Sequence, residues 1–206
     1  MTEPNPKAAD VALIVIDVQN DFCPGGALAV GGGDEIVPRI NALIEAHAQV
    51  VLTQDWHPAG HSSFASSHPG AAPFSSVTMS YGPQTLWPDH CIEGTCGAEF
   101  HAGLTWTTAQ LVLRKGFRKA IDSYSAFFEN DRRTPTGLAG YLRERGISRL
   151  VLAGLATDFC VAYSAIDAAR LGFESTVRLD ACRAIDLNGT LKAAEADMRK
   201  AGVTLF

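Results

Sequence analysis

The sequence predicts an α/β fold in which helices cover both faces of a doubly wound parallel sheet. Short apolar runs, each long enough for a buried strand, alternate along the chain with longer segments in which apolar residues recur at helical spacing. The chain has 206 residues and is 47% hydrophobic, which is enough for one substantial core. We therefore expect a single domain over residues 1–206, with a flexible tail at residues 1–10, where the sequence is polar and broken by proline.

Charge and composition narrow the class of partner. The net charge is −5, so the chain has no basic footprint that would favour nucleic acid or an anionic membrane. No apolar run reaches the length of a membrane span, and the N-terminus lacks the apolar core of a secretion signal. The five cysteines are odd in number and irregularly spaced, as expected in a reducing compartment. We expect a cytoplasmic protein that binds a small molecule, and a homo-oligomer remains open.

The first predicted strand ends in a carboxylate. Residues 11–16 form a continuous apolar run, and Asp17 follows directly. A carboxylate at the end of a buried strand is costly unless it is paired, so Asp17 needs a partner or a function. A turn-rich loop and three glycines then lead into a predicted helix that begins at residues 31–33 and ends near His47.

The second predicted strand, residues 49–53, is followed by a metal-ligand pattern. Asp55 and His57 are two positions apart, so their side chains lie on the same side of an extended segment, and His90 from a later loop can join them. One carboxylate with two imidazoles suits a divalent transition metal that keeps open positions for water or substrate. The alternative is that both histidines only cap loops, because a D-x-H pair is common. The segment from residue 57 to residue 100 has no clear periodicity, which favours a functional lid.

A lysine follows the third predicted strand. The third strand is predicted over residues 110–114, which have an apolar centre, and Lys115 stands at its end, where a solvated strand terminus is the alternative explanation. A helix is expected over residues 134–145, with Pro135 in its first position and Gly146 closing it.

The fourth predicted strand begins at Leu150, turns at Gly154 and continues as a helix of small residues. Thr157 is a candidate N-cap, which places Cys160 in the first helical turn, where the helix dipole and a nearby cation would lower the thiol pKa. The alternative is an inert buried cysteine.

The remaining elements complete the sheet and bring three chemical groups together. We expect a short strand at residues 174–178, a helix over residues 189–200 and a last strand at residues 203–206. Parallel strands present their carboxyl ends at one edge, so a carboxylate, an ammonium and a thiol that follow three strands can meet there. These groups are Asp17, Lys115 and Cys160.

Six motifs spread over residues 11–206 carry a family resemblance. They are D-V-Q-N-D-F at 17–22, Q-D-W-H-P at 54–58, G-H-S-S-F at 60–64, W-P-D-H-C-I-E-G-T at 87–95, K-G at 115–116 and G-L-A-T-D-F-C-V at 154–161. Together they resemble the nicotinamidases of the isochorismatase-like cysteine hydrolase superfamily.

The resemblance implies a three-layer α/β/α fold with a six-stranded parallel sheet, and it assigns roles to residues. It implies a catalytic triad of Asp17, Lys115 and Cys160 and a metal site of Asp55, His57 and His90. It also implies a cis peptide before Ala156 and an oxyanion hole formed by the backbone N–H groups of Ala156 and Cys160. The implied substrate-binding residues are Phe22, Trp87, Tyr124 and Leu155.

The function implied by the resemblance is deamidation of nicotinamide to nicotinic acid and ammonia through a thioester on Cys160, in NAD salvage. Pyrazinamide is an expected further substrate. The expected cofactor is one divalent transition metal ion, zinc, with iron or manganese as alternatives. Two competing functions remain: a related amidohydrolase acting on another small amide or ureido substrate, and a non-catalytic metal-binding domain.

Overall fold

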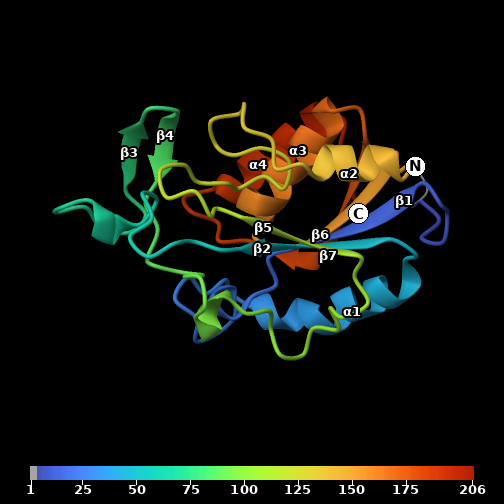
Figure 1. The fold of residues 1–206 in the computed structure, drawn as a ribbon, viewed down its shortest axis with the longest axis horizontal. Coiled ribbons are helices and arrows are strands. Elements are labelled where there is room, and N and C mark those ends of the chain that lie inside the picture. Colours follow the sequence, from blue (N-terminus) through green and yellow to red (C-terminus); the bar gives the residue numbers. More distant parts are fainter. Residues whose placement is uncertain (1–3) are drawn as a thin grey trace.

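The computed structural model describes residues 4–206 and has three layers, with a parallel sheet between two layers of helices (Figure 1). The sheet strands are β1 (Val11–Ile16), β2 (Val50–Asp55), β5 (Leu111–Lys115), β6 (Arg149–Leu155), β7 (Glu174–Arg183) and β8 (Thr204–Leu205). All are parallel, in the order β5-β2-β1-β6-β7-β8. The predicted fold class is confirmed.

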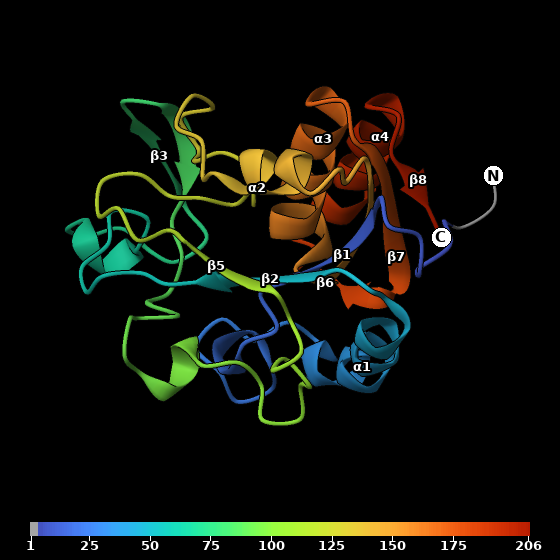
Figure 2. The same cartoon turned by 45° about the vertical axis from the view of Figure 1, so that its right-hand side comes forward.

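Helices cover both faces of this sheet. They are α1 (Val37–Ala46), α2 (Leu138–Glu144), α3 (Ala162–Arg170) and α4 (Thr190–Lys200). Helix α1 lies on one face, whereas α2, α3 and α4 lie on the other (Figures 1 and 2). Every residue of β1 and β2 is buried, as expected for central strands covered on both faces. The predicted helices at residues 31–47 and 189–200 are confirmed as α1, preceded by a 3-10 turn at Gly33–Ile36, and α4.

The register of the strands aligns their carboxyl ends. Ile16 at the end of β1 pairs with Gly154 of β6, and Asp55 at the end of β2 pairs with Lys115 at the end of β5. In Figure 1 this edge of the sheet points away from the two labelled chain termini. Residues that follow β1, β5 and β6 therefore lie close together at one edge.

The predicted helix at residues 134–145 begins later than expected. Helix α2 starts at Leu138, after Gly137, whose φ of 99° is left-handed. The segment before it is a turn in which the Asp131 carboxylate accepts hydrogen bonds from the backbone N–H groups of Arg133 and Thr134 and from the Thr134 hydroxyl. Such local bonds compete with helix formation, so the prediction of a helix start at residues 134–135 is wrong.

Strand β7 is twice as long as the predicted strand at residues 174–178. Its pairing with β6 shifts register between Leu152 and Gly154 and resumes at Gly154 opposite Cys182. Gly154 has a φ of 128°, and a Cβ there would lie 2.1 Å from the Ile16 carbonyl oxygen. Only glycine allows β1 and β6 to approach this closely.

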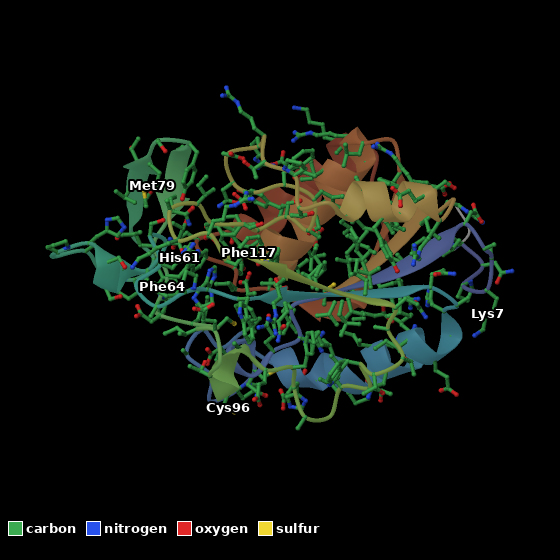
Figure 3. The ribbon with its side chains drawn as sticks, in the orientation of Figure 1. Lys7, His61, Phe64, Met79, Cys96 and Phe117 are labelled. Carbon is green, nitrogen blue, oxygen red and sulfur yellow. The ribbon has the colours of Figure 1, made fainter. Side chains whose placement is uncertain are left out.

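The segment from residue 57 to residue 100 contains regular structure that the sequence does not predict. Strands β3 (Ser76–Met79) and β4 (Gly82–Thr85) form an antiparallel hairpin at the carboxyl edge of the main sheet. Figure 3 shows His61 and Phe64 at the same end of the molecule as Met79 of the hairpin. A closing motion of this segment stays a prediction.

The N-terminal residues that the structure describes contact helix α1 and its following loop. The Lys7 ammonium donates to the Glu45 carbonyl oxygen at 3.1 Å, and the Ala48 N–H donates to the Pro6 carbonyl oxygen at 3.2 Å. The expected flexibility of residues 1–10 stays a prediction, and residues 1–3 lie outside the described part of the chain. No helix within residues 4–206 is long and apolar enough to cross a membrane.

Candidate active site

The three groups predicted at strand ends lie together at the carboxyl edge of the sheet. The Lys115 Nζ atom is 2.8 Å from Asp17 Oδ2 and 3.4 Å from Cys160 Sγ. All three side chains are buried. The second Asp17 oxygen accepts a hydrogen bond of 2.6 Å from the hydroxyl of Thr53, which fixes the carboxylate. The Lys115 ammonium is thus within hydrogen-bonding range of both a carboxylate and a thiol.

Asp55 links this cluster to the predicted metal ligands. Its Oδ1 atom accepts a hydrogen bond of 2.5 Å from Lys115 Nζ. Its Oδ2 atom faces two imidazoles, at 3.6 Å from His57 Nε2 and 3.8 Å from His90 Nε2. Sequence reasoning assigned Asp55 to the metal site only, because the pairing of Asp55 with Lys115 depends on the register between β2 and β5.

The two histidines are oriented as metal ligands. His57 Nδ1 lies 2.8 Å from the Gly116 carbonyl oxygen and His90 Nδ1 lies 2.8 Å from the Pro88 carbonyl oxygen. A carbonyl only accepts, so both Nδ1 atoms carry the proton and both Nε2 atoms present a lone pair. His57 Nε2 is buried and has no hydrogen-bond partner among the described residues. A divalent transition metal would satisfy this buried nitrogen, so the residues present fit the expected ion.

Burial and the Lys115 ammonium act in opposite directions on the pKa values of the cluster. Burial raises the pKa of the Cys160 thiol well above its usual value, and Lys115 offsets this only in part. Burial likewise raises the pKa of Asp17 against the pull of Lys115. Burial acts to lower the pKa of Lys115, but Asp17 and Asp55 outweigh it and raise that pKa well above its usual range. Cys160 is therefore a thiol beside a charged lysine at neutral pH, so the predicted lowering of its pKa is wrong.

The backbone around Cys160 also differs from the predicted helix start. Residues Thr157–Val161 form a π-helical turn that precedes α3, and its N-cap is Ala156 instead of Thr157. The Ala156 carbonyl oxygen accepts hydrogen bonds from the N–H groups of Phe159 and Val161. The peptide bond between Leu155 and Ala156 is cis, as the family resemblance implies. The predicted cap is wrong because the Ala156 carbonyl oxygen, not the Thr157 side chain, accepts the N–H groups of the first turn.

A narrow pocket opens beside Cys160. Its walls include four Phe, Trp or Tyr side chains, and Phe159 meets Trp87 edge-on with 4.8 Å between ring centroids. The hydroxyl of Tyr124 accepts a hydrogen bond of 3.0 Å from Trp87 Nε1. The lining residues are Phe22, Leu28, Asp55, Trp87, His90, Asp122, Tyr124, Ala156, Phe159, Cys160 and Ile185. The aromatic side chains of this lining suit a flat aromatic ligand.

Three of the four expected substrate-binding residues line this pocket. Phe22, Trp87 and Tyr124 do so, whereas Leu155 is not among the lining residues. Leu155 is fully buried, and its side chain reaches toward Gly33 in the core. Sequence reasoning missed Phe159 and Asp122, although the position of Phe159 directly before Cys160 was a usable signal.

The chain is similar to known proteins over nearly its whole length. The family model described as the isochorismatase domain matches residues 11–206. A nicotinamidase of Acinetobacter baylyi is 57% identical over 197 residues, which cover 96% of this chain and 92% of the relative. A solved nicotinamidase/pyrazinamidase of Acinetobacter baumanii superposes with a TM-score of 0.95 at 54% identity, covering 100% of this chain and 97% of that one. A pyrazinamidase of Pyrococcus horikoshii in complex with zinc superposes with a TM-score of 0.76 at 34% identity, covering 96% of this chain and 98% of that one.

Proposed function

The chain belongs to the isochorismatase domain family, and we propose that within it this protein is a metal-dependent cysteine amidohydrolase that converts nicotinamide to nicotinic acid and ammonia. The observation that carries the proposal is the contact of Lys115 with both Cys160 and Asp17 beside a pocket with aromatic walls and a candidate metal-ligand set. The nicotinamidases among its relatives support the choice of substrate.

The nucleophile in this proposal is generated during the attack itself. Cys160 is a thiol at rest because burial raises its pKa, so Asp17 must accept the proton as the carbon–sulfur bond forms. The raised pKa of Asp17, caused by its burial, suits a carboxylate that takes up a proton. Lys115 remains charged and stabilises the developing thiolate at 3.4 Å. The sulfur then attacks the carboxamide carbon, and negative charge moves to the carbonyl oxygen.

The same residues complete the reaction. We propose that the N–H groups of Ala156 and Cys160 stabilise the charged oxygen, a contribution of roughly 3 kcal/mol or more in comparable sites. Asp17 returns its proton to the amide nitrogen, the carbon–nitrogen bond breaks and ammonia leaves a thioester on Cys160. Asp17 then deprotonates a water molecule that attacks the thioester, and the carbon–sulfur bond breaks to release nicotinic acid.

The proposed metal site orients the substrate. Asp55, His57 and His90 would hold one divalent ion, which we take to be zinc, with iron or manganese chemically compatible. When bound, the ion supplies an electrophilic contact for the pyridine nitrogen and so holds the carboxamide toward Cys160. The aromatic walls of Phe22, Trp87 and Tyr124 then enclose the ring.

The walls of the pocket also indicate which other amides could bind. Pyrazinamide differs from nicotinamide by one ring nitrogen, so we propose that it fits the same walls. Deamidation of nicotinamide would serve NAD salvage. We further propose a cytoplasmic location and no partner other than the small-molecule substrate, apart from an assembly of identical chains.

Ammonia release from nicotinamide tests the proposal. The zinc-loaded protein should release ammonia and nicotinic acid in equal amounts, and chelation should reduce the rate. Cys160→Ala should lose roughly 10³-fold or more of the rate, because the nucleophile is gone. Cys96→Ala is the matched control, since Cys96 is exposed and lies outside the pocket.

Two results would contradict the proposed chemistry in different ways. A zinc-loaded wild type that releases no ammonia from nicotinamide would exclude this substrate and favour another small amide. A Cys160→Ala protein with near-normal turnover would exclude the thioester. In the expected case, an acid quench during turnover should leave an acyl group on Cys160 that mass spectrometry detects and hydroxylamine removes.

A further inference from the structure

Asp122 is a buried pocket carboxylate that the proposed chemistry does not use. Its residue is 3% exposed and lines the pocket together with Asp55 and Tyr124. One Asp122 oxygen, one His57 nitrogen and one His61 nitrogen all lie within 4.8 Å of one another. Asp122 is thus close to a proposed metal ligand without belonging to the set of Asp55, His57 and His90.

No lysine or arginine of residues 4–206 forms an ion pair with Asp122. Its two oxygens accept hydrogen bonds from the Ser123 N–H at 2.8 Å and from Gln84 Nε2 at 3.0 Å, both of which are neutral donors. When ionised, the buried carboxylates of Asp17, Asp55 and Asp122 carry three negative charges, and the buried ammonium of Lys115 pairs with Asp17 and Asp55. This one positive charge leaves two of the three negative charges uncompensated. Uncompensated charge is costly in a buried site, and a divalent cation would balance it.

His61 explains why Asp122 is not itself part of a second ligand set. His61 Nε2 lies 3.0 Å from the Arg118 carbonyl oxygen and therefore carries the proton. His61 Nδ1 accepts from the Ser63 hydroxyl at 2.8 Å and from the Ser63 N–H at 3.2 Å. Both ring nitrogens are occupied, so His61 has no lone pair for an ion.

Gln84 of the hairpin holds Asp122 in place. Gln84 is 1% exposed and lies on β4, and its Nε2 donates to Asp122 and, at 2.8 Å, to the Tyr124 hydroxyl. Its Oε1 accepts from Asn130 Nδ2 at 3.1 Å and from the Tyr81 hydroxyl at 3.1 Å. The side-chain amide is held at both ends, so it aims one donor at the carboxylate.

We propose that Asp122 is an outer carboxylate of the metal centre. It does not ligate the ion, but its negative charge raises the affinity of the site for a divalent cation. Gln84 is the residue that positions Asp122. The inference rests on the proposed metal site. Partners just outside the ligands commonly change metal affinity by about 10–100-fold, which sets the expected size of the effect.

Zinc affinity of the full-length protein, measured by competition with a chromophoric chelator, tests the proposal. Asp122→Asn keeps the shape of the side chain and removes its charge, so zinc should bind about 10–100-fold more weakly. Gln84→Leu keeps the Asp122 charge and removes its donor, so the loss should be smaller. Asp180→Asn is the control, because it removes a half-exposed carboxylate on β7 that pairs with Arg39. Its zinc affinity should equal that of the wild type.

A thermal denaturation series separates an electrostatic role from a structural one. Zinc raises the Tm by an amount set by its affinity for the folded protein. If Asp122 acts through its charge, Asp122→Asn should show a smaller zinc-induced rise than the wild type. A purely structural role would instead lower the Tm of Asp122→Asn without metal. If that variant also kept the full zinc-induced rise and wild-type zinc affinity, the proposal would be overturned.

These measurements do not use nicotinamide, so they are independent of the proposed reaction. A wild type that hydrolyses nicotinamide together with an Asp122→Asn protein of unchanged zinc affinity would overturn only the role of Asp122. In another outcome, Asp122→Asn binds zinc more weakly but the wild type does not hydrolyse nicotinamide. This result would support the role of Asp122 and overturn the proposed substrate.

Discussion

Replacing Lys115 with methionine should destabilise the protein strongly at neutral pH. The lysine is fully buried, and its Nζ atom is 2.8 Å from an Asp17 oxygen and 2.5 Å from an Asp55 oxygen. Methionine keeps most of the side-chain volume, so the main effect is loss of the charge. Removing one partner of a buried ion pair costs about 3–5 kcal/mol. Because two carboxylates lose their cation here, we expect a loss near the upper end, about 5 kcal/mol in the free energy of unfolding.

The loss of unfolding free energy in Lys115→Met should become smaller as the pH falls. Burial already raises the folded-state pKa of Asp17 above the unfolded value near 3.8, and loss of the Lys115 cation in Lys115→Met raises it further. Burial acts to raise the pKa of Asp55 too, but Lys115 and His57 hold it well below its usual value in the wild type, so the pKa of Asp55 also moves upward when Lys115 is lost. A group with a raised folded-state pKa favours the folded state at low pH and destabilises it as the pH rises through that pKa. The variant should therefore be closer to the wild type at pH 5 than at pH 7.

Urea denaturation of the chelator-treated protein, followed by tryptophan fluorescence at both pH values, measures these differences. Lys192→Met on α4 is the matched control, because Lys192 is exposed and its replacement should change stability by less than about 0.5 kcal/mol. A loss below about 1 kcal/mol for Lys115→Met at pH 7, or an equal loss at pH 5 and pH 7, would refute the electrostatic reasoning.

Three further predictions follow from local geometry. A Cβ at Gly116 would lie 2.4 Å from His57 Cε1, so Gly116→Ala should displace this ligand and weaken zinc binding roughly tenfold or more in chelator competition. Tyr124→Phe leaves the buried indole N–H that binds its hydroxyl without that acceptor, which should cost about 1–3 kcal/mol in urea denaturation. Burial raises the pKa of Cys23 to about 11, so peptide mapping after iodoacetamide treatment at pH 8 should find exposed Cys96 modified long before Cys23, and equal rates would contradict this.

The sequence predicts the sheet and its functional edge because both depend on local patterns. The apolar run at residues 11–16 and its counterparts identify strands by burial on both faces. Residues directly after such strands must lie at the carboxyl edge, which is why Asp17 and Lys115 could be placed together with no knowledge of the long-range contacts. Where the pattern is weaker the predictions are less accurate, as in the second half of β7, which carries the charged residues Arg178, Asp180 and Arg183.

Contacts between distant segments could not be predicted in the same way. Gln84 reaches Asp122 and Tyr124 only because the β3–β4 hairpin folds back over the carboxyl edge. The hairpin strands are mostly exposed or half-buried, so they carry no apolar run that would reveal them. The bond between Lys115 and Asp55 likewise depends on the register of two strands that are 60 residues apart in sequence.

By itself, the sequence determines which chemical groups this protein can use and the edge of the sheet at which they gather. A thiol, an ammonium, two imidazoles and several carboxylates are present in the chain, and strand periodicity places most of them. Only the tertiary structure decides their protonation and pairing. The pKa of Cys160 is raised because burial outweighs Lys115, and burial and distance are properties of the packed chain. No local pattern of residues can therefore reveal that Cys160 is a thiol at rest or that Asp55 is shared between Lys115 and the two histidines.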